Sequence, residues 1–207
     1  MVKVNIEQGS EAWFELRAGR ITGSRYGKMM SGINTSGYQT LVSDLASEIF
    51  SGEIEETYVS PAMQRGSELE PEARAVYEFK TGLDVSQVGM CLPDEDNDFH
   101  NWIGYSPDGL ADNDKILQEF KCPMAKTHRK YLKADKLPNE YKWQVQGGLW
   151  LTGADYCDFM SYHPLMEPFL IKVLPDAEMH REFEDRLILT IKNVKSELED
   201  YNKFKLF

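Results

Sequence analysis

Three residues with side chains suited to metal and acid–base chemistry stand close together near the middle of the chain. Asp108 lies in the sequence SPDGL, and Glu119 and Lys121 lie in QEFKCP, which follows after a short polar turn. If residues 112–114 form the turn of a hairpin, side-chain alternation puts Glu119 and Lys121 on one strand face. An antiparallel partner can then bring Asp108 opposite that face. The spacing therefore predicts two carboxylates and an ammonium group at one place.

Two carboxylates this close repel each other at neutral pH unless a divalent cation lies between them. Magnesium prefers oxygen ligands and keeps several waters when only one or two carboxylates bind it. One such water can lose a proton and attack phosphorus, while the metal stabilises the leaving oxygen. Lys121 would orient that water or neutralise charge that develops on the phosphate. Asp108 and Glu119 are therefore candidate magnesium ligands, and all three residues are candidate catalytic residues.

The alternative is that Glu119 and Lys121 are solvated residues on an exposed strand and that SPDG is only a turn, since a lone E-x-K is common by chance. Here the two motifs occur in order, at hairpin distance, and Cys122-Pro123 directly behind them can end a strand. This combination favours the site over the chance match.

These motifs resemble those of a known family. PD followed by EFK resembles the PD-(D/E)xK nuclease signature, and SPDGL with EFKCP is similar to the phage lambda-type exonucleases, also called YqaJ-type viral recombinase nucleases. The resemblance extends from Glu7 through the final helix. It implies a restriction-endonuclease-like core and Mg²⁺-dependent 5′-to-3′ digestion of double-stranded DNA, with release of 5′-mononucleotides and a 3′ single-stranded overhang for recombination by strand annealing. It also implies a ring-shaped homotrimer and a single-strand annealing protein as partner. The sequence leaves open whether Mn²⁺ substitutes.

In the mechanism that we infer with this resemblance, Asp108 and Glu119 hold the metal with the backbone carbonyl of Phe120. Glu70 joins the acidic cluster through water. Local pattern also points to Glu70, because it lies on the apolar stripe of a helix expected over residues 61–80, where an unpaired carboxylate is costly. Pro71 offers an alternative, in which a new helical segment starts there and Glu70 caps it. The sequence GSELE, which ends at Glu70, resembles the family's G-x-x-x-E helix and favours the site.

A candidate anion site lies near the amino end. Thr22 and Ser24 stand where a helix is expected to begin, and Arg17 could add a fork-shaped partner for a phosphate. The local pattern alone fits ordinary helix capping and a surface arginine equally well. The sequence LRAGRITGS resembles the family's amino-terminal motif, whose arginine and serine grip the 5′-phosphate of the digested strand. The resemblance therefore assigns Arg17 and Ser24 to the 5′-phosphate, with Thr22 and Ser106 as further candidates.

Gln144 and Gln146 lie on a helix expected over about residues 140–151, and they cannot share a face. One of them is expected to face the site, where an amide can hold a phosphate oxygen or the lysine. The sequence YKWQVQ resembles the family's third motif, in which a glutamine binds near the active centre, and alignment favours Gln144. Either glutamine could instead be a surface residue of the helix.

The 207 residues predict a single nuclease domain over residues 1–207. The net charge of −11 argues against a general nucleic-acid binder, because phosphate contacts need lysine and arginine. Basic residues nevertheless gather in two places, the segment 121–142 and the segment 17–28. An acidic exterior with local basic strips suits an enzyme that holds DNA at one groove.

The three cysteines, Cys91, Cys122 and Cys157, are widely spaced and include no C-x-x-C pair. They indicate neither a disulfide framework nor a cysteine zinc site, and they are too few for an iron–sulfur cluster. No apolar segment approaches the length of a membrane span and the amino end has no signal-peptide pattern, so we expect a cytoplasmic protein without a membrane partner.

The element order predicts an α/β fold with a mixed central β-sheet flanked by helices. Besides the central hairpin, strands are expected over residues 85–92, 156–162 and 169–173, and a long amphipathic helix over residues 176–201. Two alternative functions remain. One is an endonuclease or DNA-repair nuclease on the same core. The other is a non-catalytic DNA-end-binding module, which the acidic charge mildly favours and the intact acid–acid–lysine set opposes.

Overall fold

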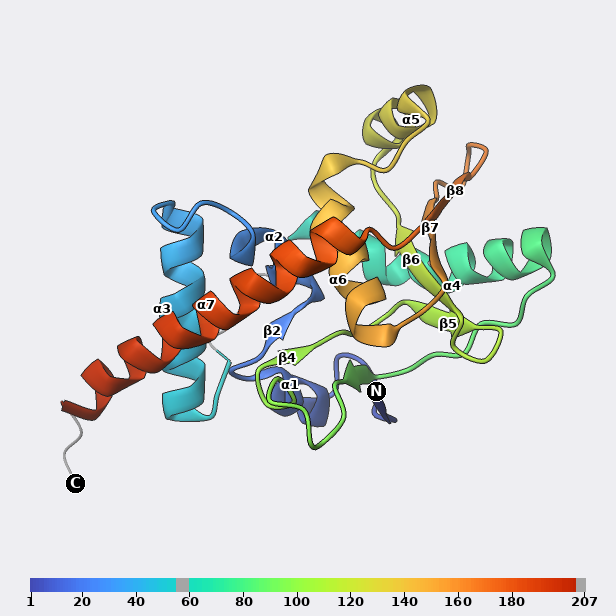
Figure 1. Ribbon diagram of the computed structural model, residues 1–207. Helices are drawn as coiled ribbons and strands as arrows, with labels where there is room; N and C mark the ends of the chain where they lie inside the picture. Colours follow the sequence, from blue (N-terminus) through green and yellow to red (C-terminus); the bar gives the residue numbers. More distant parts are fainter. Residues whose placement is uncertain (55–59, 204–207) are drawn as a thin grey trace. The chain divides into compact units, whose positions relative to one another are not determined.

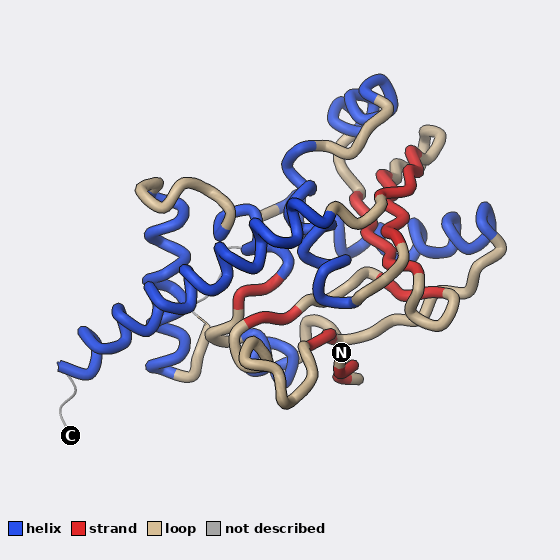
Figure 2. The backbone as a smooth tube through the Cα atoms, viewed as in Figure 1, coloured by secondary structure: helices blue, strands red, loops and turns tan. Residues whose placement is uncertain are grey.

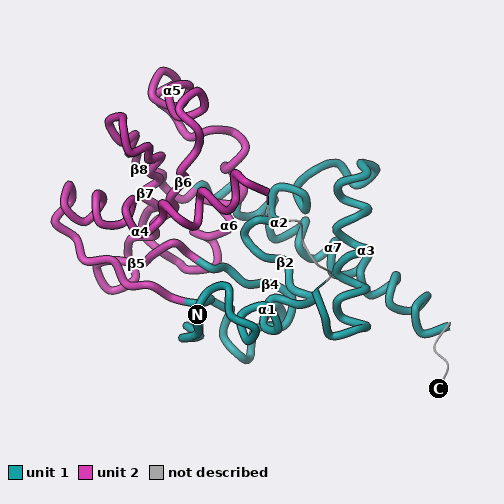
Figure 3. The backbone as a smooth tube through the Cα atoms, turned by 180° about the vertical axis from the view of Figure 1, so that it is seen from behind, with its two compact units in different colours: residues 1–57, 89–106, 176–207 teal, residues 58–88, 107–175 magenta. Residues whose placement is uncertain are grey.

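The computed structural model describes residues 1–54 and 60–203 and is a mixed α/β fold (Figure 1). The strands are short, and the helices contain many more residues than the strands (Figure 2). The chain forms two compact units, each assembled from separate stretches of sequence (Figure 3). Unit 1 comprises residues 1–57, 89–106 and 176–207, and unit 2 comprises residues 58–88 and 107–175. The single nuclease domain over residues 1–207 stays a prediction.

Unit 2 is built on a mixed four-stranded sheet in the order β5-β6-β7-β8. Its strands are β5 (Gly109–Ala111), β6 (Ile116–Lys121), β7 (Tyr156–Ser161) and β8 (Phe169–Val173). The β6–β7 pair is parallel and the two outer pairs are antiparallel. The helices of this unit are α4 (Pro61–Thr81), α5 (Ala125–Ala134) and α6 (Lys142–Thr152), with the 3-10 helix η1 (Asn139–Tyr141) before α6.

The predicted hairpin is confirmed. Gly109 of β5 lies opposite Gln118 of β6, and the antiparallel pairing continues to Ala111 and Ile116. The turn falls on residues 112–114, which adopt φ values of 49°, 56° and 68°. Asp and Asn tolerate this left-handed region better than most residues, because their short polar side chains bond the local backbone. The DND sequence therefore closes the hairpin at the predicted place.

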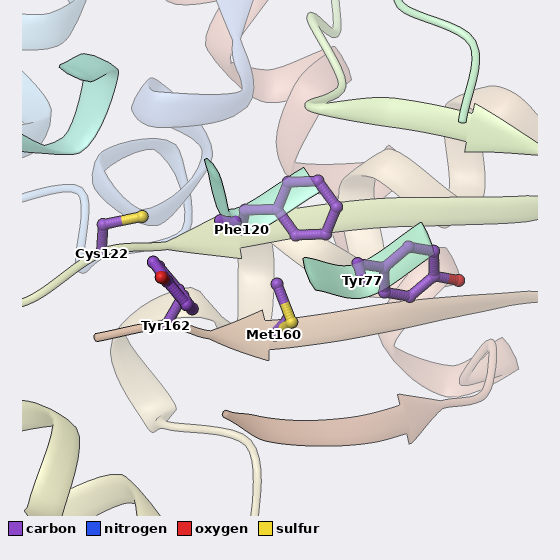
Figure 4. Packing of buried hydrophobic residues seen from close by; sticks show 6 residues of the cluster. Tyr77, Phe120, Cys122, Met160 and Tyr162 are labelled. Carbon is purple, nitrogen blue, oxygen red and sulfur yellow. The ribbon is translucent and has the colours of Figure 1, made fainter. Parts of the chain in front are cut away.

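Strand β6 is central to this sheet and is covered on both faces. Phe120 packs on one face against Ala73 and Tyr77 of α4, in a cluster that also contains Cys122, Met160 and Tyr162 (Figure 4). Because side chains alternate along a strand, Glu119 points to the opposite face, where it contacts Gln144 of α6. The buried apolar face thus fixes which way the polar residues of β6 point.

Helix α4 runs without interruption through Pro71. It starts at Pro61 after the N-cap Ser60, whose side chain accepts the Met63 N–H at 3.2 Å, and it ends at the left-handed Gly82. The alternative in which Pro71 starts a new segment with Glu70 as its cap is therefore wrong. Packing of Ala73 and Tyr77 against the sheet compensates for the backbone hydrogen bond that proline cannot make.

The buried hydrogen bond from the Tyr77 hydroxyl to Asp158 Oδ2, at 2.6 Å, predicts a measurable stability effect. Burial raises the pKa of Asp158 and the Tyr77 hydrogen bond lowers it, so the bond stabilises the ionised form. Tyr77→Phe should reduce the free energy of unfolding by about 1–3 kcal/mol at neutral pH. The loss should shrink as the pH falls and Asp158 is protonated in both states.

Urea unfolding at several pH values measures this effect. Tyr162→Phe is the matched control, because Tyr162 belongs to the same cluster as Tyr77. Its hydroxyl donates to Glu72 Oε1 at 2.5 Å, and Glu72 is exposed. An equal loss in both variants at every pH would contradict the role of the Asp158 charge.

Unit 1 consists mainly of helices around two short strand pairs. Its helices are α1 (Glu11–Arg17), α2 (Gly23–Met29), α3 (Ser36–Ser51) and α7 (Ala177–Lys203). Strand β1 (Val2–Val4) pairs antiparallel with β3 (Met90–Leu92), and β2 (Ile21–Thr22) pairs parallel with β4 (Ile103–Gly104). Helix α7 is the predicted long amphipathic helix and packs against α3 and α2. None of the described helices is long and apolar enough to cross a membrane.

The strand expected over residues 85–92 is shorter than predicted. Only residues 90–92 form a strand, β3, whereas Ser86 makes an isolated bridge to Leu110 of unit 2. Between them Gly89 lies against the backbone of Ile6, so closely that a Cβ there would be 2.2 Å from the Ile6 carbonyl oxygen. The segment therefore changes partners along its length.

Candidate active site

The hairpin of unit 2 brings Asp108, Glu119 and Lys121 together. Asp108 directly precedes β5, and its Oδ2 accepts the backbone N–H of Phe120 at 2.6 Å. The Glu119 side chain is only 1% exposed, and the Lys121 ammonium forms an ion pair with it. Gln144 Nε2 donates to Glu119 Oε1 at 2.5 Å. Lys121 and Gln144 thus both bind Oε1 of the buried Glu119 carboxylate, and the backbone of the same strand binds the carboxylate of Asp108.

The electrostatics of the cluster disfavour two bare negative charges. Burial raises the pKa of Asp108 well above its usual value, the charge of Glu119 raises it further, and Lys121 opposes both. Burial lowers the pKa of Lys121, but the charges of Glu119 and Asp108 outweigh this effect, and the pKa is raised. Lys121 is therefore an ammonium at neutral pH, and the carboxylate pair has the repulsion that a cation would relieve.

The donor set fits a hard divalent cation. Among the described residues, no three His, Cys, Asp or Glu side chains lie close enough to form a metal site by themselves. Two carboxylates, a backbone carbonyl such as that of Phe120 and water are the set that magnesium accepts in proteins. Carboxylate and carbonyl oxygens suit magnesium or manganese better than a soft metal, which prefers thiolate ligands.

Glu70 lies at the edge of this cluster and is held by an arginine that sequence reasoning missed. Arg74 Nη2 donates to Glu70 Oε1 at 2.6 Å and to the backbone carbonyl of Asp108 at 3.3 Å. The charge of Glu70 also raises the pKa of Asp108, after burial and the charge of Glu119. The i, i+4 spacing of Glu70 and Arg74 on α4 was the available signal.

Of the two candidate glutamines, Gln144 contacts the acidic cluster. Gln146 is buried and donates instead to the backbone carbonyl of Leu174 at 2.9 Å. A further neighbour of the cluster is Tyr141, whose ring centroid lies 5.2 Å from Lys121 Nζ. Sequence reasoning named Tyr141 only as part of a motif. Its ring covers the ammonium group and favours its charged form.

The predicted anion-binding residues lie together in unit 1. Arg17 Nη2 donates to Thr22 Oγ1 at 2.9 Å and to Ser24 Oγ at 3.4 Å. The Arg17 guanidinium lies 4.1 Å from the ring centroid of Trp13, whose indole N–H donates to Ser106 Oγ at 3.0 Å. Trp13 therefore connects Ser106 with Arg17, a link that no sequence spacing indicated.

Arg17 has the properties of an anion-binding cation. In the part of the chain that the structure describes, no carboxylate forms an ion pair with Arg17. Burial and the charge of Arg25 lower its pKa to about 10, so it stays protonated at neutral pH. Thr22 is the N-cap of α2, and its side chain makes no capping hydrogen bond. A guanidinium beside two hydroxyl groups can bind an oxyanion by several hydrogen bonds.

The fold and these motifs define a nuclease. The crystal structure of an alkaline exonuclease from Laribacter hongkongensis is similar with a TM-score of 0.84 and 33% identity, over 94% of this chain and 97% of that one. The same enzyme in complex with dAMP gives a TM-score of 0.83 and 32% identity over the same shares of both chains. A phage-related exonuclease from Haemophilus somnus 129PT shares the fold, with a TM-score of 0.65 and 16% identity over 88% of this chain and 96% of that one.

The chain belongs to the family of YqaJ-like viral recombinase domains, whose family model matches residues 12–155. This match confirms the resemblance seen in the SPDGL and EFKCP motifs. The matched range contains segments of both units, including every candidate site residue from Arg17 to Gln144. No curated protein matches the chain.

Proposed function

We propose that the protein is a magnesium-dependent exonuclease that digests double-stranded DNA in the 5′-to-3′ direction. It would release 5′-mononucleotides and leave a 3′ single-stranded overhang for recombination by strand annealing. The observation that carries this proposal is the buried Glu119 carboxylate, held by Lys121 and Gln144 beside the carboxyl group of Asp108. The similarity to a solved alkaline exonuclease, also seen in complex with the mononucleotide dAMP, supports it.

Each site residue of unit 2 has a separate role in the proposed hydrolysis. When bound to Asp108, Glu119 and the Phe120 carbonyl, magnesium would supply a water of lowered pKa and stabilise the leaving oxygen. Lys121 orients the attacking water and stabilises negative charge on the phosphate, for which its ammonium form is suited. Gln144 holds the Glu119 carboxylate in one orientation, and Arg74 does the same for Glu70. Manganese has similar oxygen preferences and is an alternative ion.

The residues of unit 1 give the enzyme its preference for a DNA end. Arg17, Thr22 and Ser24 would bind the 5′-terminal phosphate, and Ser106 would join them through its contact with Trp13. Because no described carboxylate pairs with Arg17, a doubly charged terminal phosphate would gain a full charge-assisted contact. A 5′-hydroxyl end would lack this contact.

Helix α5 offers a basic surface for the duplex. It buries His128 and Tyr131 and exposes the opposite face, which carries Lys126, Arg129, Lys130 and Lys133. Contacts with phosphates by such a surface do not depend on sequence and weaken with salt. In a chain with a net charge of −11, this local concentration supports DNA as the substrate.

The proposed assembly and partner are those that the family resemblance implies. We infer a ring-shaped homotrimer, a single-strand annealing recombinase protein as partner, and action in the cytoplasm, where the DNA substrate would lie. Light scattering in solution measures the subunit count, and a mass other than three times that of the chain would contradict the trimer.

A panel of three DNA substrates tests the proposed activity. With Mg²⁺, linear duplex DNA carrying a 5′-phosphate should be digested rapidly, the same duplex with a 5′-hydroxyl more slowly, and a closed circle not at all. Products of the linear reaction should be 5′-mononucleotides, and EDTA should stop it. Arg17→Ala should reduce the rate on the phosphorylated end to that on the hydroxyl end.

Two outcomes of this panel would support a different function. Cleavage of the closed circle would identify an endonuclease or DNA-repair nuclease on the same core. Binding of DNA ends without metal-dependent loss of any substrate would identify a non-catalytic DNA-end-binding module.

A further inference from the structure

A buried ion pair lies in unit 1 next to the residues proposed to bind the 5′-phosphate. It joins Arg25 of α2 to Glu48 of α3. The Arg25 side chain is 17% exposed and the Glu48 side chain is 3% exposed. Both terminal nitrogens of the guanidinium take part, Nη1 donating to Oε2 at 2.8 Å and Nη2 donating to Oε1. Two-point pairs of this kind have a defined geometry as well as a strong attraction. Arg25 and Glu48 thus form a fixed element of the interior.

The same pair holds the loop that follows Arg17. Glu48 Oε2 accepts the backbone N–H of Gly19 at 2.9 Å, and Arg25 Nη1 donates to the backbone carbonyl of Arg20 at 3.2 Å. The loop between α1 and β2 is therefore bonded at two successive residues by the two partners of one ion pair.

The loop also lies directly against helix α3. Gly19 has a φ of +71°, which favours glycine, and a Cβ at this position would lie 2.4 Å from the Ile49 side chain. Arg17 precedes this loop and Thr22 follows it. The loop conformation consequently determines the geometry of the hydrogen bond between the Arg17 guanidinium and the Thr22 hydroxyl.

The two charges of the pair also act on Arg17 itself. After burial, the charge of Arg25 is the largest influence lowering the pKa of Arg17, and the charge of Glu48 raises it. With both partners ionised, their two charges act on Arg17 in opposite directions. If Arg25 were absent, the Glu48 carboxylate would lose its ion-pair partner, and its charge would attract Arg17 and repel an incoming phosphate.

We propose that Arg25 and Glu48 are positioning residues for the 5′-phosphate site. Arg25 neutralises Glu48, so that the charge of Arg17 remains available to the DNA end, and the pair fixes the loop that orients Arg17 toward Thr22 and Ser24. The two residues act through Arg17 and not by touching the reacting atoms. The inference rests on the proposed function, because it assumes that Arg17 binds a 5′-phosphate.

The ratio of kcat/KM for a 5′-phosphorylated duplex to that for the same duplex with a 5′-hydroxyl measures this role. Arg25→Met leaves the Glu48 carboxylate unpaired, and the ratio should fall about tenfold. The double variant Arg25→Met/Glu48→Gln removes both charges and keeps an acceptor for the Gly19 N–H, so the ratio should recover to within about threefold of the original value. Lys192→Met, which removes an exposed charge from helix α7 of the same unit and lies outside both basic segments, should leave the ratio unchanged.

A second measurement separates binding from turnover. Fluorescence anisotropy in EDTA compares the affinities for the two kinds of DNA end without any reaction. The affinity advantage of the phosphorylated end should fall in Arg25→Met and return in the double variant. If Arg25→Met does not fold, Arg25→Lys replaces it. This variant keeps the charge and loses the two-point contact, and the ratio should fall about threefold.

Each result decides between the possibilities. Arg25→Met, or Arg25→Lys in its place, could lower the Tm and leave the kcat/KM ratio unchanged. The ion pair would then only stabilise the fold, and the inference would be wrong. Failure of the double variant to recover would also overturn it, because the unpaired Glu48 charge would not be the cause. A ratio of one in the unmodified protein would instead disprove the proposed phosphate site itself.

Discussion

Lys121→Ala is expected to reduce the turnover number on linear duplex DNA by about 10²–10⁴-fold, the range for loss of a positioned catalytic proton or charge donor. The affinity for DNA ends should change little, because the ammonium group is half-buried and paired with Glu119. Single-turnover digestion in Mg²⁺ gives the rate of the chemical step, and fluorescence anisotropy in EDTA gives the affinity. A loss of affinity equal to the loss of rate would identify a binding residue instead.

Lys115→Ala is the matched control for this experiment. Lys115 lies in the turn directly before the same hairpin strand and is exposed. Removing it changes the net charge by the same amount without touching the acidic cluster. The turnover number of Lys115→Ala should stay within about twofold of that of the unmodified protein, because surface substitutions away from special features have small effects. Unchanged turnover in Lys121→Ala would remove this lysine from the mechanism.

Asp108→Asn should have opposite effects on stability and activity. Without metal, the change relieves the repulsion between Asp108 and Glu119 in a desolvated place, and the asparagine carbonyl can still accept the Phe120 N–H. A gain of 1 kcal/mol in the free energy of unfolding corresponds to about 2–4 °C in Tm for a chain of this length. Hydrolysis should fall at least about 10³-fold, because a metal ligand is lost.

Thermal unfolding with and without Mg²⁺ measures both parts of this prediction. The unmodified protein should gain stability as Mg²⁺ is added, since ligands that bind only the folded state raise Tm. Asp108→Asn should start from a higher Tm in EDTA and gain little from Mg²⁺. Asp112→Asn, in the exposed turn of the same hairpin, should behave like the unmodified protein in its response to the metal. A lower Tm of Asp108→Asn in EDTA would contradict the charge argument.

The hairpin could be predicted from sequence because its determinants are local. The DND turn lies only a few residues from Glu119 and Lys121, which share a strand face, and both motifs that resemble the family lie within this segment. The positions of α4 and α7 followed from apolar spacing, and the bounds of α4, α6 and α7 agree with expectation within a few residues. Local β-propensity also explains the one error of length, since it favoured a continuous strand over residues 85–92, of which only 90–92 form a strand. The alternative break at Pro71 is excluded by the continuous helix α4.

The contacts without a sequence signal join residues far apart in sequence. The indole of Trp13 reaches Ser106, and the guanidinium of Arg25 reaches Glu48, with no regular spacing between the partners. A sequence can indicate that each residue is polar and near a motif, but the partner depends on how helices and loops pack. Even Arg74, at helical spacing from Glu70, could not be assigned its second contact with the Asp108 carbonyl.

The order of pairing in the sheet of unit 2 has a consequence for the way this unit folds. Strands β5 and β6 are neighbours in sequence and close a short loop, whereas β6 pairs with β7 only after helices α5 and α6 have been traversed. Closing the longer loop carries the larger entropic penalty, so we expect the parallel pairing to form later. In that order Asp108 and Glu119 would come together early, and the Gln144 amide would reach Glu119 only when the crossover is complete.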